Sequence, residues 1–130
     1  MCNFVPMNIE ELREYCLGLR HVTEEMPFDD VTLVFKVGGK MFCLTSLVGE
    51  LRISVKCDPD EALEMREIFP AVLPGCHLNK KHWNTVIIDG SISDGMLKVW
   101  ILKSYNLVVA GLPLKEKRRL GLVNLDKRDK

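Results

Sequence analysis

The chain has no long apolar run and no signal peptide at its start. No window approaches the roughly 18 uninterrupted apolar residues that a membrane helix needs. The opening Met-Cys-Asn-Phe-Val-Pro lacks a basic segment followed by an apolar one. The cysteines are five, widely scattered and without a Cys-x-x-Cys pair, which excludes a disulfide framework and indicates a reducing compartment. We therefore expect a soluble, cytoplasmic protein with no membrane contact.

A net charge of either sign is also missing, because 18 basic residues balance 18 acidic ones. The distribution is uneven: residues 1–30 carry seven acids against two bases, and residues 112–130 carry seven bases against three acids. Proteins that bind nucleic acids without sequence preference usually have a strongly basic domain, since neutralising phosphates supplies most of their affinity. In this chain, a basic region of that kind is at most local.

Size and composition fit one compact domain. A chain of 130 residues buries roughly two-thirds of the surface that it exposes when unfolded, which is enough for a core without disulfides or metals. Apolar residues make up 47% and charged residues 28%, and no repeat or low-complexity segment interrupts the chain. We predict a single domain over 1–130, with its core at about 8–120 and a frayed tail at 121–130.

The helix signals are clear at three places. Asn8 precedes an apolar stripe at helical spacing, which predicts a helix over 8–20. Asp58 followed by Pro59 and two acids is a strong helix start, and it predicts a helix over 59–69. A third helix, over 95–110 and capped by Asp94, lies between Asp-Gly and Gly-Leu-Pro, and a short helical turn should follow Pro113.

Four segments have the pattern of strands. Residues 31–37 and 40–46 flank a Gly-Gly pair that predicts a tight hairpin. Residues 51–57 alternate apolar and polar side chains, which indicates one buried and one solvated face, and 83–89 forms the last strand. The predicted order is α-β-β-β-α-β-α. This order favours an α+β fold with an antiparallel sheet and helices packed on one face.

The run at 74–86, Pro-Gly-Cys-His-Leu-Asn-Lys-Lys-His-Trp-Asn-Thr-Val, resembles the signature of the MmcQ/YjbR family of small bacterial proteins. Shorter pieces agree in the same order: Gly-Lys-Met-Phe at 39–42, Val-Lys-Cys-Asp-Pro at 55–59, Asp-Gly at 89–90 and Ser-Tyr at 104–105. The resemblance covers 8 to about 120. It implies a frataxin-like (CyaY-like) fold and the family's frequent description as DNA-binding, after a proposed double-wing motif. It implies no catalytic residues.

The family run supplies the candidate binding surface. Its lysines and histidines could hold a phosphate backbone, and its one aromatic side chain, Trp83, could stack on a base, with Lys56 and Tyr105 expected nearby. The candidate residues are Lys56, His77, Asn79, Lys80, Lys81, His82, Trp83 and Tyr105. A simpler interpretation is structural: Asn79 and His77 satisfy loop backbone groups, Trp83 fills the core and the lysines lie in solvent.

Metal and enzyme chemistry have weaker support. Cys57, Cys76, His77 and His82 are suitable ligand types, but their spacing does not suit one ion. The acids of the first helix, Glu10, Glu11 and Glu14, invite comparison with the iron-binding ridge of frataxins, and a solvated face explains them better. No nucleophile has a placed base. We expect no metal, no cofactor and no enzymatic activity.

The leading hypothesis is therefore a non-enzymatic binding module of the MmcQ/YjbR type that binds DNA weakly and without sequence preference. The alternative is a protein-interaction or small-anion-binding domain that uses the surface around residues 77–83. Frataxin-like metal handling is the third hypothesis.

Overall fold

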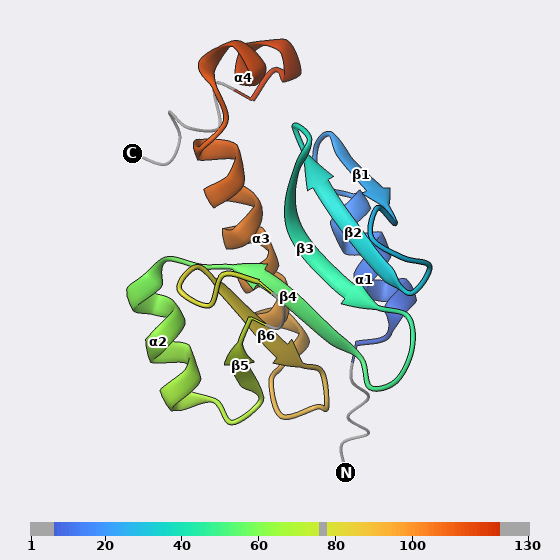
Figure 1. Cartoon of the computed structure of the whole chain (residues 1–130), viewed down its shortest axis with the longest axis vertical. Helices are drawn as coiled ribbons and strands as arrows, with labels where there is room; N and C mark the ends of the chain where they lie inside the picture. Colours follow the sequence, from blue (N-terminus) through green and yellow to red (C-terminus); the bar gives the residue numbers. More distant parts are fainter. Residues whose placement is uncertain (1–6, 76–77, 123–130) are drawn as a thin grey trace.

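A computed structural model describes residues 7–75 and 78–122. Its centre is a six-stranded sheet in the order β1-β2-β3-β4-β6-β5, in which every neighbouring pair is antiparallel (Figure 1). The strands are β1 (Val22–Glu25), β2 (Thr32–Val37), β3 (Lys40–Ser46), β4 (Arg52–Lys56), β5 (Val72–Pro74) and β6 (Trp83–Ile87). This confirms the predicted antiparallel α+β architecture.

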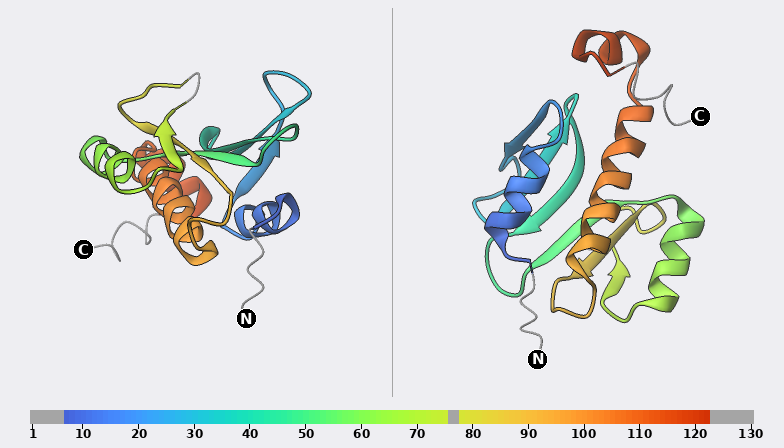
Figure 2. Two further views of the ribbon diagram at one scale, coloured as in Figure 1. Left: turned by 90° about the horizontal axis from the view of Figure 1, so that it is seen from below. Right: turned by 180° about the vertical axis from the view of Figure 1, so that it is seen from behind.

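Four helices accompany the sheet: α1 (Ile9–Leu17), α2 (Pro59–Ile68), α3 (Asp94–Ala110) and α4 (Leu114–Leu120). Leu12 of α1, Ala62 of α2 and Ile101 of α3 belong to one buried cluster with the inward side chains of the sheet. The two views in Figure 2 show α1 and α3 side by side beneath the same face. The helices therefore leave the opposite face of the sheet open.

The helix starts follow the predicted chemistry, with one difference. The side chain of Asn8 accepts a hydrogen bond from the Glu11 backbone N–H, and the Glu11 carboxylate accepts one from the Asn8 backbone N–H, so the capping box is complete. Asp58 caps α2 as expected. The α3 cap is Ser93, not Asp94, because the Ser93 hydroxyl accepts from Met96 N while the Asp94 carboxylate accepts from Met7 N.

The predicted order α-β-β-β-α-β-α is wrong at two places, because β1 and β5 are additional strands. The sequence of β1, Val-Thr-Glu-Glu, carries two acids that disfavour a strand, yet Glu24 pairs with Arg13 of α1 through hydrogen bonds of 2.9 and 2.5 Å. The second strand, β5, has three residues and ends in a proline, which removes a backbone donor. Both are edge strands, and tertiary contacts decide their conformation.

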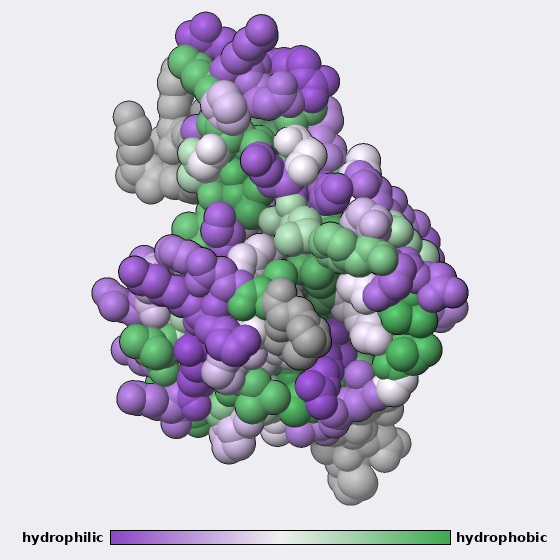
Figure 3. Space-filling view, viewed as in Figure 1, coloured by the Kyte–Doolittle hydropathy of each residue, from purple (hydrophilic) through white to green (hydrophobic). Residues whose placement is uncertain are grey.

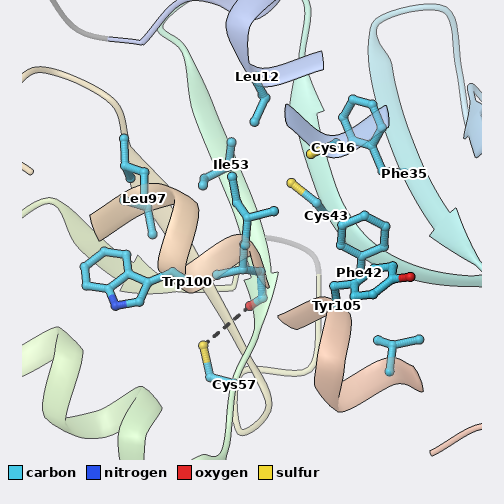
Figure 4. Close-up of a cluster of buried hydrophobic side chains, with 14 of the residues drawn as sticks. Leu12, Cys16, Phe35, Phe42, Cys43, Ile53, Cys57, Leu97, Trp100 and Tyr105 are labelled. Atoms are coloured by element: carbon cyan, nitrogen blue, oxygen red, sulfur yellow. Dashed lines mark hydrogen bonds between the residues drawn. The ribbon is translucent and has the colours of Figure 1, made fainter. Parts of the chain in front are cut away.

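The main core lies between the sheet and the helices, as predicted. Leu97, Ile101, Ser104 and Val108 of α3 are all buried, and Phe42 meets Tyr105 edge to face with ring centroids 5.4 Å apart (Figure 4). A register shift between β2 and β3 leaves Phe42 as the extra residue, so that Phe42 and the adjacent Cys43 both enter this core.

Within the described residues, no single helix has both the length and the apolar content needed to span a membrane. The sequences of α3 and α4 together meet both criteria, but the two helices are bent by 119° relative to each other.

Candidate functional site

The open face of the sheet carries a groove of about 450 Å³. Two segments rise from this face on either side of it, residues 26–31 between β1 and β2 and residues 78–82 before β6 (Figure 2, left). The space-filling view of this face shows apolar side chains around a hollow and hydrophilic ones around the rim (Figure 3). The lining residues are Phe28, Asp29, Thr32, Leu44, Thr45, Ser46, Arg52, Ser54, Leu78 and Thr85.

The floor of the groove is built by alternation along the central strands. Ser54 of β4 and Thr85 of β6 lie opposite each other in register, and their hydroxyl oxygens are 3.0 Å apart. Beside them, Leu44 and Val34 pack with Trp83 in a second, smaller buried cluster. The floor therefore joins hydroxyl groups to an apolar patch, which is the usual composition of a ligand pocket.

The wall at 26–31 is shaped by one carboxylate. The Asp29 carboxylate accepts from the backbone amides of Val31 and Thr32 at 3.0 and 2.7 Å, and these hydrogen bonds hold its pKa below the ordinary value. Asp29 thereby fixes the turn that presents Phe28, whose ring is 62% exposed. An aromatic side chain that is so exposed beside a groove is available for contact with a ligand.

The wall at 78–82 is anchored by α2. The Arg66 guanidinium donates to the Asn84 side chain through Nε at 2.7 Å, and its Nη2 donates to the backbone oxygens of Lys80 and Trp83. Asn84 is fully buried and donates to Ala62 O at 3.1 Å. This network holds the segment against the body of the domain, and sequence reasoning missed both Arg66 and Asn84.

Two of the aromatic candidate residues are buried. Trp83, the expected stacking residue, is 9% exposed and packs against Val34 and Leu44, so its ring does not present a free face to a base. It fills the smaller buried cluster, and not the main core that the structural interpretation expected. Tyr105, expected near this surface, is 3% exposed, lies on the helix side of the sheet and donates its hydroxyl proton to Arg20 O at 2.6 Å.

The polar residues of the candidate surface have different roles in the structure. Asn79 accepts from Lys81 N at 2.9 Å, as the structural interpretation expects, and Lys80 donates from Nζ to Gly75 O at 2.9 Å, so its ammonium stabilises the loop. Lys81 is exposed. His82 accepts from Cys57 N through its backbone oxygen. The structure thus brings 79–83 to one end of the groove.

Lys56 stands opposite Trp83 in the β4–β6 register, but it does not line the groove and lines a separate cleft beside α2. Its amide donates to the Ser104 hydroxyl of α3 at 2.8 Å. His77 and Cys76, two further candidates, lie outside the described residues.

The groove is not basic. Its two charged lining residues are Asp29, which is held by the turn, and Arg52, which pairs with Glu50 at 3.0 Å. Among the residues that the structure describes, the lining therefore contains none of the lysines or aromatic rings named from the sequence, and it favours a mostly neutral ligand.

Metal and thiol chemistry find little support in the described part of the chain, where no three His, Cys, Asp or Glu side chains come together to hold an ion. Burial raises the pKa of the Cys57 thiol to about 11. Cys16 and Cys43 point towards each other in the core (Figure 4), and the Cys16 thiol together with burial raises the pKa of Cys43. Cys43 and Cys57 therefore remain protonated and are poor nucleophiles at neutral pH.

Comparison with known proteins settles the family. A family model described as YjbR matches residues 17–107. The chain belongs to the YjbR family. It is 40% identical over 112 residues to an Escherichia coli O157:H7 protein, YbdF, with 85% of this chain and 92% of that protein covered. It is 34% identical over 115 residues to YjbR of Escherichia coli K12, with 88% and 97% covered. Both relatives are described as uncharacterized.

Two solved structures have the same fold as this YjbR-family chain. One is a Deinococcus radiodurans protein with a DUF419 domain, which is 43% identical, superposes with a TM-score of 0.84 and covers 88% of both chains. The other, from Pseudomonas syringae, is 22% identical with a TM-score of 0.69, and the match covers 78% of this chain and 98% of that one. The second likeness concerns the fold alone.

Proposed function

We propose that this YjbR-family chain is a non-enzymatic protein-interaction module that binds an extended, mostly apolar peptide segment in the groove on the open face of its sheet. One observation carries the proposal: Phe28, Leu44 and Leu78 line the groove beside hydroxyl groups, while the two charged lining residues, Asp29 and Arg52, are already engaged. The protein-interaction hypothesis was the alternative drawn from the sequence, where it used the surface around residues 77–83. The proposed binding surface is now the groove that residues 78–82 help to form.

The shape of the groove supports a segment of chain over a compact ligand. Its lining residues come from the strands β2, β3, β4 and β6 and from the segments 26–31 and 78–82 on its two sides. The hydroxyls of Ser54 and Thr85 are hydrogen-bonded to each other on the floor between the walls. Phe28 and Leu78 lie at the two walls, where apolar side chains of the partner would contact them.

The absence of catalysis is part of the proposal. The raised pKa values of Cys57 and Cys43 argue against a thiolate nucleophile, and the charged groups of the groove are fixed in structural roles. A cytoplasmic location also stays a prediction, and the buried free thiols of Cys16, Cys43 and Cys57 are consistent with a reducing compartment.

The experiment is selection from a phage library of random ten-residue peptides on the immobilised protein. We expect enriched sequences with apolar residues at alternate positions. Phe28→Ser should weaken a selected peptide at least tenfold, in line with the loss of an aromatic anchor. Val48→Ser is the matched control, because Val48 is 58% exposed and does not line the groove. No enrichment, or equal losses in both variants, would reject the proposal.

Weak, sequence-independent DNA binding is the second candidate, and the position of Lys81 favours it. Lys81 is exposed beside the wall at 78–82, so its ammonium is available to a phosphate. With three or four phosphates neutralised, the slope of log affinity against log salt should be about −3. Titration of labelled duplex and single-stranded DNA at two salt concentrations measures this slope.

The charge variant for that test is Lys81→Ala, which should flatten the slope by about one unit. Lys80→Ala is a poor choice, because the Lys80 ammonium holds Gly75 O and its loss would disturb the wall itself. An unchanged slope in Lys81→Ala would remove this surface as a DNA site. The third candidate, frataxin-like metal handling, rests on the expected CyaY-like fold alone.

A further inference from the structure

A second apolar surface lies on the helix side of the molecule, away from the groove. Residues of α2 and α3, together with Lys56 and Cys57 at the end of β4, line a cleft of about 250 Å³. Three exposed apolar residues line it, Ile68 (61% exposed), Met96 (39%) and Leu107 (40%), and two more, Val99 (50%) and Leu102 (38%), lie elsewhere on α3. We call these five residues the apolar row; exposed apolar side chains gathered along α3 and the adjacent end of α2 indicate a contact surface.

Opposite charges flank this apolar row. On one side α2 carries four acids and one arginine, and that arginine, Arg66, turns away to hold the wall of the groove. At the far end of α3, α4 carries four bases and one acid. Glu61 and Glu64 line the cleft, and Lys115, Arg118 and Arg119 are exposed on α4. The α2 surface is therefore acidic where the α4 surface is basic.

The arrangement of the helices makes these charges self-complementary. Figure 1 shows α2 beside the first half of α3 and α4 beyond its last turn. The contacts agree, since Glu61 pairs with Lys103 at 3.7 Å and the rings of Phe69 and Trp100 lie 5.2 Å apart. A two-fold axis across the middle of α3 would pack two copies of α3 antiparallel at Val99 and Leu102. It would also set the basic α4 of each copy against the acidic α2 of the other.

We propose that this face binds a second copy of the chain and forms a two-fold dimer through α3, with α4 against α2 at both ends. The zero net charge of the chain removes the overall repulsion that would oppose self-association. An anionic lipid surface fits less well, because Glu61 and Glu64 line the cleft together with Ile68, Met96 and Leu107. The groove on the open face remains free in such a dimer.

Sedimentation velocity of the full chain over about 1 μM to 1 mM tests the proposal, since this range separates weak dimers from stable ones. We expect the mass to rise from 14.8 kDa towards twice that value. Val99→Asp should weaken the dimer at least tenfold, because a carboxylate at the centre of the contact is buried without a partner. Val48→Asp, an equally exposed valine away from this face, should leave it unchanged. A monomer at all concentrations would overturn the proposal.

Charge reversal tests the orientation. Lys115→Glu with Arg118→Glu should weaken the dimer, and adding Glu64→Lys with Glu67→Lys to the same chain should restore it. If the wild type stays monomeric but floats with phosphatidylserine vesicles, and the Val99→Asp variant no longer floats with them, the face binds lipid and the dimer proposal is wrong. A dimer that the reversal variants leave unchanged would overturn the α4–α2 contact.

Discussion

The Arg66 guanidinium of α2 is hydrogen-bonded to the buried Asn84 carboxamide of β6, with Nε 2.7 Å from Oδ1. This pair connects the helix layer to the segment that walls the groove, because the same guanidinium also donates to Lys80 O and Trp83 O. The position of the 78–82 wall is thus set from the opposite side of the sheet. The position of one groove wall therefore depends on the Arg66–Asn84 hydrogen bond, although neither residue lines the groove.

Removing Arg66 should therefore destabilise the domain more than an exposed arginine does. Arg66→Ala should lower the free energy of unfolding by about 2–4 kcal/mol, because hydrogen bonds from a charged donor are lost and Asn84 is left partly unpaired. Arg52→Ala, which breaks an exposed pair with Glu50, should cost less than about 1 kcal/mol. Urea unfolding measures both. In a double-mutant cycle with Asn84→Ala, a coupling energy near zero would contradict the account.

The β2–β3 turn offers a matched pair of glycines. Both have positive φ, +60° at Gly38 and +79° at Gly39, as the tight hairpin turn requires. An added Cβ at Gly38 would lie 2.8 Å from Leu112 Cδ1, whereas one at Gly39 would meet nothing within 4 Å. Gly39→Ala should cost about 1 kcal/mol of left-handed strain, and Gly38→Ala about 1–3 kcal/mol more because of overpacking. Equal losses of thermal stability in the two variants would contradict this prediction, because the Leu112 side chain would then move aside at little cost.

Cys57 should behave as an unreactive thiol. It is 7% exposed and burial raises its pKa to about 11, so at pH 8 almost none of it is the reactive thiolate. We expect iodoacetamide to modify the peptide that contains Cys57 slowly in the folded protein at pH 8 and readily after unfolding in urea, as followed by mass spectrometry. Rapid alkylation in the folded state would point to an activated cysteine and would reopen the question of catalysis.

The Arg13–Glu24 pair should make stability depend on acid pH. Hydrogen bonding to Arg13 lowers the pKa of Glu24 in the folded state. The stabilisation is therefore fully present above the unfolded pKa of about 4.3, and it is lost as the pH falls through the lower folded value. Arg13→Gln should reduce the drop in unfolding free energy below about pH 4 relative to the wild type. Parallel pH profiles for the two proteins would contradict this assignment.

The sequence predicted the main strands and helices because each carries a local signal. Caps, a Gly-Gly turn and alternating residues lie within a few positions of the elements that they define, as at Asn8 and Gly38. The strand β1 escaped prediction because its stability comes from pairing with β2 and from Arg13 across the core. Local patterns cannot report such distant partners.

The candidate site was predicted less well, for a related reason. The family run located one wall of the groove, but it gave no information on which side chains are buried, so Trp83 and Tyr105 were assigned to binding. Phe28 and Leu78 lie far apart in the sequence and face each other only in the folded chain. An exposed aromatic residue in a short loop, Phe28 after Pro27, was the one available signal.

The most direct test of the groove is an NMR titration of the isotopically labelled protein with a peptide from the phage selection, run in parallel with a short single-stranded DNA. We predict that the peptide shifts the backbone amides of Thr32, Ser46, Ser54 and Thr85, which border the groove, and that Phe28→Ser abolishes these shifts. Peptide shifts elsewhere on the domain, or DNA shifts around Lys56 and Lys81 with none on the groove floor, would contradict the account.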